Sequence, residues 1–345
     1  MPHPGPSSRR ACGFGVSAGA MVGWLVLAPG VLGHGDAPSE APGIASLLLA
    51  WTFPPLPTLA ILAAAIAWWW AVARVGAVHP SNPVPRVRSY AFYGALVAVA
   101  FALLSGVERY DTTLFTVHMV QHILLTLVAA PLFALSSPIT LLLRVTSPVV
   151  RRRWILPVLH SRAVRVVAFP VVAWVAFAGV MWLSHFSALF DAALEEPLIH
   201  DLEHSLFLGS AVLFWWPAIA LDPAPWRMGH PARILYVFLQ MTQNTFLSVV
   251  ILGASVVLYP HYATVARPWG PTALADQATA AGIMWILGDA IFILAIMAVV
   301  AGWMRAEDRA ADRADRRADE AYVTIRARER RLAERLARER DDPHG

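Results

Sequence analysis

The sequence has too little charge for a water-soluble protein of its length. Only 14% of its 345 residues are charged, whereas 57% are hydrophobic, and the mean hydropathy is +0.56. The charges are also concentrated, because 12 of the 27 basic and 11 of the 23 acidic side chains fall in residues 305–345. The first 304 residues therefore hold too few charges to solvate a soluble surface. This excludes a soluble globular enzyme and a disordered scaffold and indicates an integral membrane protein.

Lysine is absent and cysteine occurs once. All basic side chains are arginine, and we attribute the net charge of +4 to membrane topology, so no nucleic-acid partner is expected. Cys12 alone excludes a disulfide framework and a cysteine-based zinc site. We find no phosphate-binding glycine loop, no paired carboxylates at matched depth and no serine with a suitable base. A non-enzymatic role is therefore expected.

Eight apolar stretches are long enough to cross a bilayer as helices. They cover residues 11–32, 56–75, 90–107, 112–135, 164–183, 200–221, 232–258 and 277–304. The first has a basic start and a small-residue end, which is typical of a signal peptide cleaved before His34 or of an uncleaved first span. The predicted fold class is an all-α integral membrane protein with a seven-transmembrane-helix bundle over residues 34–304. A signal peptide or extra apolar helix (1–33) precedes it, and a charged cytoplasmic C-terminal helix (305–345) follows.

Arginines in the short loops predict the orientation, because cytoplasmic loops are enriched in them. The connection 136–163 holds Arg144, Arg151, Arg152, Arg153 and Arg162. The loops 76–89 and 222–231 and the tail also carry arginine, whereas the opposite loops contain only Arg109 and Arg267. We therefore expect a bacterial-type plasma membrane protein, in contact with membrane lipid, whose seven-span core begins outside and whose C-terminus is cytoplasmic.

Two histidine pairs lie in the outer halves of predicted spans. His118 and His122 are four residues apart, as are His200 and His204, so each pair stacks on one face of a helix. Polar side chains within a membrane are costly and mark functional sites. If the two helices are neighbours, the four imidazoles predict a site for copper, zinc or iron. The alternative is that each ring bonds a carbonyl group of a neighbouring helix.

Other side chains could complete this site. Additional ligands at a similar depth are Met181, His185 and Met284. Methionine would favour Cu(I), although it also commonly fills gaps in apolar cores. Gln121 and Glu203 each precede the second histidine of a pair and could hold the ring N–H groups from behind. His34, if it becomes the N-terminus after cleavage, could form a second outer copper site.

Three segments together resemble the polytopic CtaG family, whose members are linked to assembly of cytochrome c oxidase. They are His-Met-Val-Gln-His at 118–122, His-Asp-Leu-Glu-His at 200–204 and Ala-Asp-Gln at 275–277. The resemblance extends over roughly residues 50–304. The resemblance implies a factor that matures the oxidase, with oxidase subunits as partners and copper as cargo. By motif position it implies that the four paired histidines are the metal ligands. Asp276 and Gln277 form a third motif, expected behind the ligands or, for Asp276, as a helix cap.

Two other functions remain open. A copper transporter would need polar or methionine ligands that continue across the bilayer, and the inner halves of the spans hold few of them. A haem-binding electron carrier would use one histidine from each pair as an axial ligand. The sequence favours a non-enzymatic assembly factor that binds copper at the outer histidines.

Overall fold

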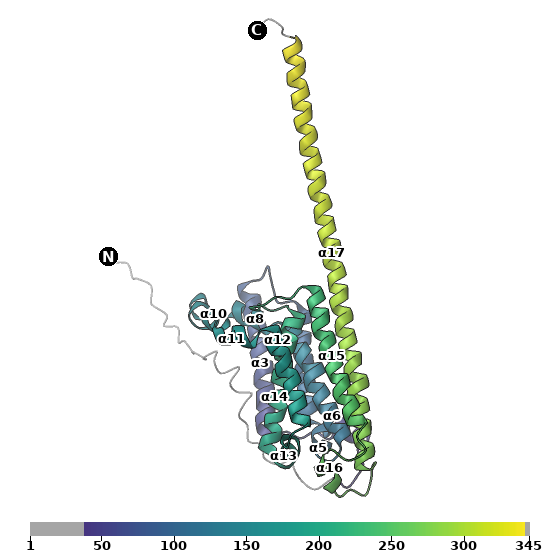
Figure 1. The fold of residues 1–345 in the computed structure, drawn as a ribbon. Helices are drawn as coiled ribbons and strands as arrows, with labels where there is room; N and C mark the ends of the chain where they lie inside the picture. The colour runs from purple at the N-terminus through teal and green to yellow at the C-terminus, as the bar shows by residue number, and fades with distance from the viewer. Residues whose placement is uncertain (1–37, 342–345) are drawn as a thin grey trace, which may run out of the picture.

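The computed structural model describes residues 38–341, with side chains through residue 338. The predicted signal segment (1–33) and His34 lie outside the described residues. Within the described range all regular secondary structure is helical, which confirms the predicted all-α class. Figure 1 shows a bundle of roughly parallel long helices from which one helix, α17, extends far beyond the others.

The long helices coincide with the predicted apolar stretches to within several residues. They are α3 (Pro55–Val78), α4 (Arg86–Leu104), α6 (Phe115–Ile123), η1 (Leu124–Ala129), α7 (Ala130–Ser136), α12 (Pro170–His185), α14 (Pro197–Ile219), α15 (His230–Leu252) and α17 (Ala273–Asp341). Short helices join them: α2 (Ile44–Leu49), α5 (Gly106–Tyr110), α8 (Pro138–Val145), α9 (Pro148–Val150), η2 (Arg151–Ile155), α10 (Leu156–Leu159), α11 (Arg162–Val167), α13 (Leu189–Glu195) and α16 (Pro260–Thr264).

Five helical segments are long and apolar enough to cross a membrane. The number rises to six if α12 and α13, which are bent by 70° relative to each other, count as one span. The 23-residue α14 is long enough, but its histidines and acidic residues lower its hydropathy. The prediction of seven spans is therefore supported in part, and the seventh span stays a prediction.

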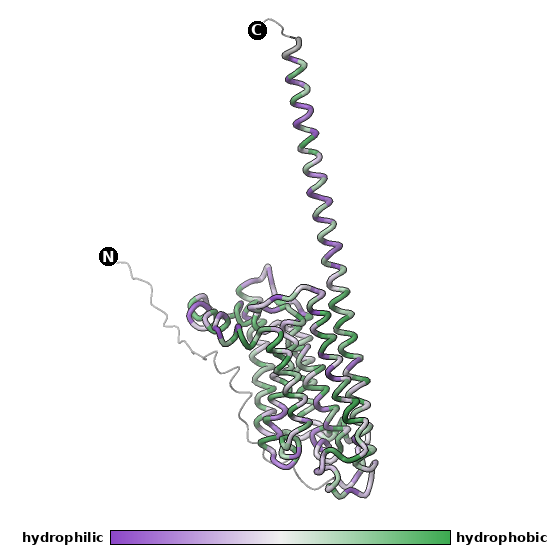
Figure 2. The backbone as a smooth tube through the Cα atoms, viewed as in Figure 1, coloured by the Kyte–Doolittle hydropathy of each residue, from purple (hydrophilic) through white to green (hydrophobic). Residues whose placement is uncertain are grey.

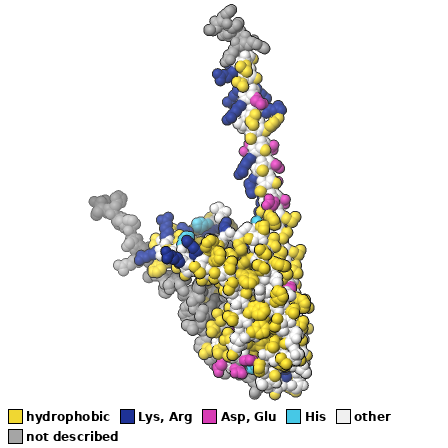
Figure 3. Space-filling view, in the orientation of Figure 1, with side chains coloured by type: hydrophobic (Ala, Val, Ile, Leu, Met, Phe, Trp, Pro, Cys, Tyr) yellow, Lys and Arg dark blue, Asp and Glu magenta, His cyan; other side chains and the backbone are white. Residues whose placement is uncertain are grey.

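The outward faces of these helices are apolar, which suits contact with lipid. Leu59, Leu62 and Ile66 on α3 are 62%, 53% and 63% exposed, and Ile286 and Leu294 on α17 are 69% and 65% exposed. Hydrophobic residues cover the visible face of the bundle, whereas charges gather at its ends and on the projecting helix (Figures 2 and 3). Water would not solvate such a face, but hydrocarbon would.

Small residues let the helices of the core approach closely. Ala102, Ala129, Ala130, Ala211 and Ala280 are completely buried in one cluster that joins α4, η1, α7, α14 and α17. Membrane helices cannot rely on a hydrophobic effect against lipid, so close van der Waals packing of this kind stabilises the bundle.

The helix that carries His118 and His122 widens into a π-helical segment, η1, directly after them. Pro131 has no N–H group to donate to the preceding carbonyl groups. The indole Nε1 of Trp215, on α14, donates instead to the carbonyl oxygen of Thr126 at 2.9 Å. One side chain thus satisfies the backbone group that the π-helical turn frees and links the two histidine-bearing helices.

The two ends of the bundle differ in charge and structure. The arginine-rich connection forms α8 to α11 at the end from which the long tail projects, and α5, α13 and α16 cover the opposite end (Figures 1 and 3). The predicted tail is helical through Asp341 and continues the last bundle helix without a break, giving one helix of 69 residues. At 1.5 Å per residue the part after residue 304 is about 55 Å long.

Candidate metal centre

The two histidine pairs meet near the end of the bundle covered by α5, α13 and α16. Within the pairs, the ring centroids are 4.3 Å apart for His118 and His122 and 4.2 Å for His200 and His204. Between the pairs, His118 lies 5.5 Å from His200 and His122 lies 5.9 Å from His204. All four residues are at most 5% exposed. The structure therefore brings together the four histidines that the sequence singled out.

Carboxylates face these rings, and they change the nature of the site. Asp111, in the turn between α5 and α6, places Oδ2 3.6 Å from Nε2 of His200. Glu203, on α14, places Oε2 3.8 Å from Nε2 of His118 and accepts a hydrogen bond from Ser184. Two overlapping groups could hold a metal ion, with all potential ligand atoms in each within 4.8 Å of one another: Asp111, His118 and His200, and His118, His122 and Glu203.

The structure thus adds carboxylates to the four imidazoles that helix spacing brought together, and the four-nitrogen ligand set stays a prediction. Glu203 was expected behind the ligands, and the structure places it among them. Asp111 was missed, and the expectation of no paired carboxylates at matched depth was wrong. One signal was present in the sequence: the loop 108–111 is so short that its acidic residues must lie directly over the following helix, which carries His118.

Several polar atoms of the centre have no hydrogen-bond partner in the described part of the chain. They are Oδ2 of Asp111, both ring nitrogens of His118, both ring nitrogens of His122 and Oε2 of Glu203. Burial raises the pKa of the Asp111 carboxyl well above its usual value. Leaving such groups unpaired costs roughly 1–3 kcal/mol each. A cation between the rings and carboxylates would satisfy them together, so the donor set fits a metal ion that accepts nitrogen and oxygen ligands, such as copper or zinc.

Gln121 supports the centre from behind, as expected. Its Oε1 accepts a hydrogen bond from Nε2 of His204 at 3.0 Å. Its Nε2 donates to the carbonyl oxygen of Ala102 at 3.0 Å and to Oε2 of Glu108 at 2.6 Å. These two donor bonds fix which way the amide points, and therefore which nitrogen of His204 carries the proton.

The turn that carries Asp111 is held by the cap over this end of the bundle. The hydroxyl of Tyr262, on α16, donates to the carbonyl oxygen of Asp111 at 2.8 Å. Nε2 of His261 contacts the carbonyl oxygen of Thr112 at 2.9 Å. Tyr262, which lies 151 positions later in the chain, thereby holds the turn of a potential metal ligand in place.

Asp276 and Gln277 both accept hydrogen bonds from backbone amides of other segments. The Asp276 carboxylate accepts hydrogen bonds from the amides of Phe115 at 2.7 Å and Thr116 at 3.4 Å, so it caps the first turn of α6. Oε1 of Gln277 accepts from the amide of Leu258 at 2.8 Å. Asp276 is thus a helix cap, but for the neighbouring helix that carries His118 and His122 rather than for its own.

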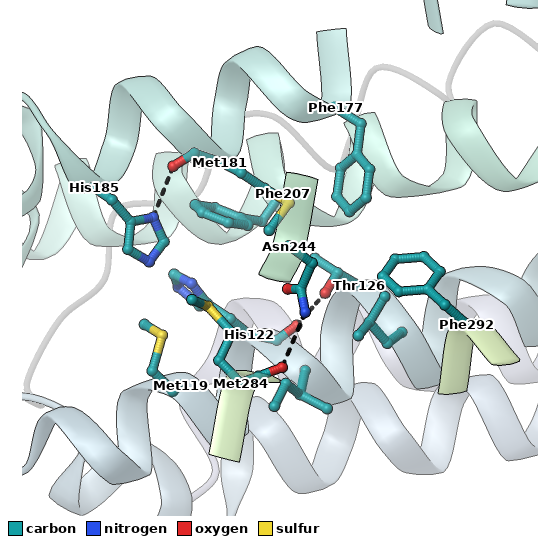
Figure 4. A pocket seen from close by; sticks show the side chains of 12 residues that line it. Met119, His122, Thr126, Phe177, Met181, His185, Phe207, Asn244, Met284 and Phe292 are labelled. Atoms are coloured by element: carbon teal, nitrogen blue, oxygen red, sulfur yellow. Dashed lines mark hydrogen bonds between the residues drawn. The ribbon is translucent and has the colours of Figure 1, made fainter. Parts of the chain in front are cut away.

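The additional ligands considered from the sequence lie on one side of the centre. Met181, His185 and Met284 line a small cavity that His122 also borders (Figure 4). Nδ1 of His185 contacts the carbonyl oxygen of Met181 at 2.7 Å. The cavity lies one helical turn farther from the capped end than His118 does, so these residues do not join the carboxylate groups.

Comparison with known proteins identifies the family. The model of the cytochrome c oxidase caa3 assembly factor (Caa3_CtaG) family matches residues 66–306, which hold all four paired histidines and the Asp276-Gln277 motif. The chain belongs to this family. This membership confirms the resemblance drawn from the three motifs.

Curated relatives come from mycobacteria. Uncharacterized proteins of Mycobacterium bovis and Mycobacterium tuberculosis are each 33% identical over 291 residues, and one of Mycobacterium leprae is 29% identical over 291 residues. The matches cover 82% of this chain but only 44% of each relative, so the chain spans less than half the length of these proteins. No solved structure matches the chain significantly.

Proposed function

We propose that this protein is an assembly factor of cytochrome c oxidase, which binds copper between its paired histidines and the facing carboxylates and supplies the ion to oxidase subunits. The observation that carries the proposal is the group formed by His118, His200 and Asp111, whose potential ligand atoms lie within 4.8 Å of one another in the interior. A histidine and carboxylate set of this kind binds copper well. Family membership supplies the oxidase as the recipient.

The proposed setting is a bacterial-type plasma membrane that the domain 34–304 crosses seven times. In this topology α14 is also a membrane span and brings the number of spans to seven. Its 23 residues pack alongside α12 and α7 within the bundle. The arginine-rich α8–α11 end and the tail (305–345) face the cytoplasm. The metal centre then lies near the outer surface, from which a copper centre of the oxidase can be reached.

The haem alternative is less favoured by the packing. The rings of the two pairs already lie 5.5 and 5.9 Å apart across the helix interface. The cavity beside them measures about 20 Å³, which is space for one water-sized occupant and not for a macrocycle. The absence of a Soret band in the purified protein would agree with the copper proposal, and a strong redox-sensitive one would contradict it.

Metal analysis tests the proposal most directly. The full chain is purified in detergent beside a variant with His118, His122, His200 and His204 replaced by alanine. A matched variant replaces His79 and His160, which are exposed at the opposite end. We expect copper in the wild type and the matched variant and none in the fourfold variant.

Oxidase activity in cells that carry only one of these variants then tests delivery. We expect the fourfold variant to lower it and the matched variant to leave it intact. Equal copper content in a folded fourfold variant would reject the site, whereas normal oxidase activity despite lost copper would reject its role in delivery.

A further inference from the structure

A second group of potential metal ligands lines the small cavity beside the centre. The cavity lies among α6, α12, α14, α15 and α17, and its volume of about 20 Å³ admits one water-sized occupant. Figure 4 shows the rings of His122 and His185 facing one another across it. Three methionines, Met119, Met181 and Met284, also line it, and Phe177, Phe207 and Phe292 supply much of the remaining wall.

The two imidazoles present free nitrogen atoms in a buried position. Nδ1 of His185 lies 2.7 Å from the carbonyl oxygen of Met181, so it donates its proton there and leaves the lone pair on Nε2. Among the described residues, Nε2 of His185 and both ring nitrogens of His122 have no hydrogen-bond partner. The residues are 4% and 5% exposed, so water outside the bundle does not compensate them. An occupant of the cavity would supply the missing partner for these nitrogen atoms.

The two rings are suitably placed to share one ion. Their centroids are 6.5 Å apart and their planes are nearly perpendicular, at 78°. With metal–nitrogen bonds of about 2.0 Å, two imidazoles bound to one ion on opposite sides have centroids roughly 6 Å apart. A shift of less than about 1 Å therefore lets both rings bind one ion, with methionine sulfur atoms completing its coordination.

The other polar side chains that line the cavity donate hydrogen bonds to backbone carbonyl groups. The hydroxyl of Thr126 donates to the carbonyl oxygen of His122 at 2.6 Å, and the amide of Asn244 donates to the carbonyl oxygen of Met284 at 3.1 Å. No carboxylate lines the cavity within the described residues. The available ligands are thus neutral imidazole nitrogen and thioether sulfur, which together select soft metal ions.

The charge of the ion follows from the same composition. An ion in an apolar interior loses hydration energy that rises with the square of its charge, and no carboxylate among the described residues lines this cavity to offset the loss. A singly charged soft ion is therefore favoured over any divalent one. We propose that His122, His185, Met119, Met181 and Met284 form a Cu(I) site, distinct from the histidine and carboxylate centre and bordered by the shared His122.

This site rests on the proposed function only in taking copper as the cargo of the protein. Four of its five ligands can be replaced without removing a histidine or carboxylate of the centre, because only His122 is shared with a carboxylate-containing group. Conversely, Asp111 and His200 do not line the cavity. Variants can therefore separate the two sites.

The test uses the full chain in detergent, loaded with Cu(I) under anaerobic conditions. X-ray absorption is expected to show copper–sulfur scattering in the wild type. M119L/M181L/M284L keeps the side-chain volume and is expected to lose this scattering and to bind Cu(I) at least about tenfold more weakly in competition with bicinchoninate. The matched variant M228L/M241L/M297L changes three methionines that do not line the cavity and should behave as wild type.

The outcomes distinguish this site from the proposed function. Copper bound by the wild type without sulfur scattering would overturn the Cu(I) site, as would a folded M119L/M181L/M284L protein with unchanged affinity. D111N/H200A is expected to retain the sulfur scattering, and its loss would show that the two sites are not separate. Normal oxidase activity in cells expressing the fourfold histidine variant would instead contradict copper delivery, whereas sulfur scattering from the wild type would still support the Cu(I) site.

Discussion

The two faces of His122 border chemically different surroundings. Toward the capped end of the bundle, the histidines meet the carboxylates of Asp111 and Glu203. One helical turn farther in, His122 faces His185 and three methionines across a cavity with aromatic walls. Imidazole is common to both regions, so the neighbouring oxygen or sulfur atoms decide which ion each region favours. In the two proposed sites, a single turn of a membrane helix therefore separates nitrogen and oxygen ligands from nitrogen and sulfur ligands.

The largest expected effect is that of replacing His118, which should weaken copper binding in one of these two regions and not in the other. His118 belongs to both carboxylate-containing groups but does not line the cavity. H118A is expected to lower divalent copper affinity at least about 100-fold while Cu(I) binding with sulfur scattering persists. Parallel titrations of the purified variant with Cu(II) and Cu(I) measure both. An equal loss of both ions would contradict the division.

Removing the charge of Asp111 is expected to have a smaller effect of the same kind. D111N keeps the size of the side chain but replaces a charged ligand atom by a weaker neutral one. Divalent copper affinity should fall about 10- to 100-fold and Cu(I) affinity should not change. Competition titration with a copper chelator provides the measurement, with D201N on the partly buried face of α14 as the matched acidic control. A D111N protein with wild-type affinity would show that the carboxylate does not bind the ion.

The cap on α6 connects both regions to the last long helix. D276A leaves the amides of Phe115 and Thr116 without their acceptor and is expected to cost about 2 kcal/mol of unfolding free energy. Denaturant titration of the detergent-solubilised protein measures this loss. Because α6 carries His118 and His122, both copper affinities should weaken together. An effect confined to one of them would contradict a role through the helix.

Trp215 offers a milder test of the π-helical segment. W215F removes the indole donor to Thr126 and retains most of the aromatic packing, so we expect a loss of about 1–2 kcal/mol. Copper binding at the carboxylate centre should change little, because η1 begins after His122. Thermal unfolding beside copper titration checks both expectations. The matched control is W216F, because the indole of Trp216 has no hydrogen-bond partner in the part of the chain that the structure describes.

The smallest expected effect concerns the projecting tail. Side chains from Ala310 through Arg338 are exposed throughout and contact neither region of the histidine cluster. Truncation after residue 309 is therefore expected to leave both copper affinities unchanged, which the same titrations would show. A changed affinity would reveal a contact between the tail and the bundle that the structure does not contain.

Several features of the site could be predicted from local spacing. The pairs His118/His122 and His200/His204 were recognised because four-residue spacing aligns side chains on one helix face. Gln121 directly precedes the second histidine of its pair and was therefore expected behind the ligands, and the structure shows its contact with His204. Predictions of this kind require only the geometry of one helix.

Other features depended on contacts between distant segments. Asp111 becomes a potential ligand because Tyr262 holds its turn over His200, and Met119 becomes one because α6 presents it to the same cavity as Met181 and Met284. Asp276 was considered a cap for its own helix, yet it caps α6, more than 150 residues earlier. The contacts that define these roles join segments that lie far apart in the sequence.

By itself the sequence determined the class of the protein and the positions of its apolar helices, because burial in lipid requires long apolar segments whatever their neighbours are. It also determined which helix faces carry imidazole. Only the tertiary structure decided which oxygen and sulfur atoms meet those faces, because that depends on how the helices rotate and pack against one another. The low number of charged residues indicated which segments lie in the membrane. The packing of the helices decided that the carboxylates of Asp111 and Glu203 lie beside the histidines.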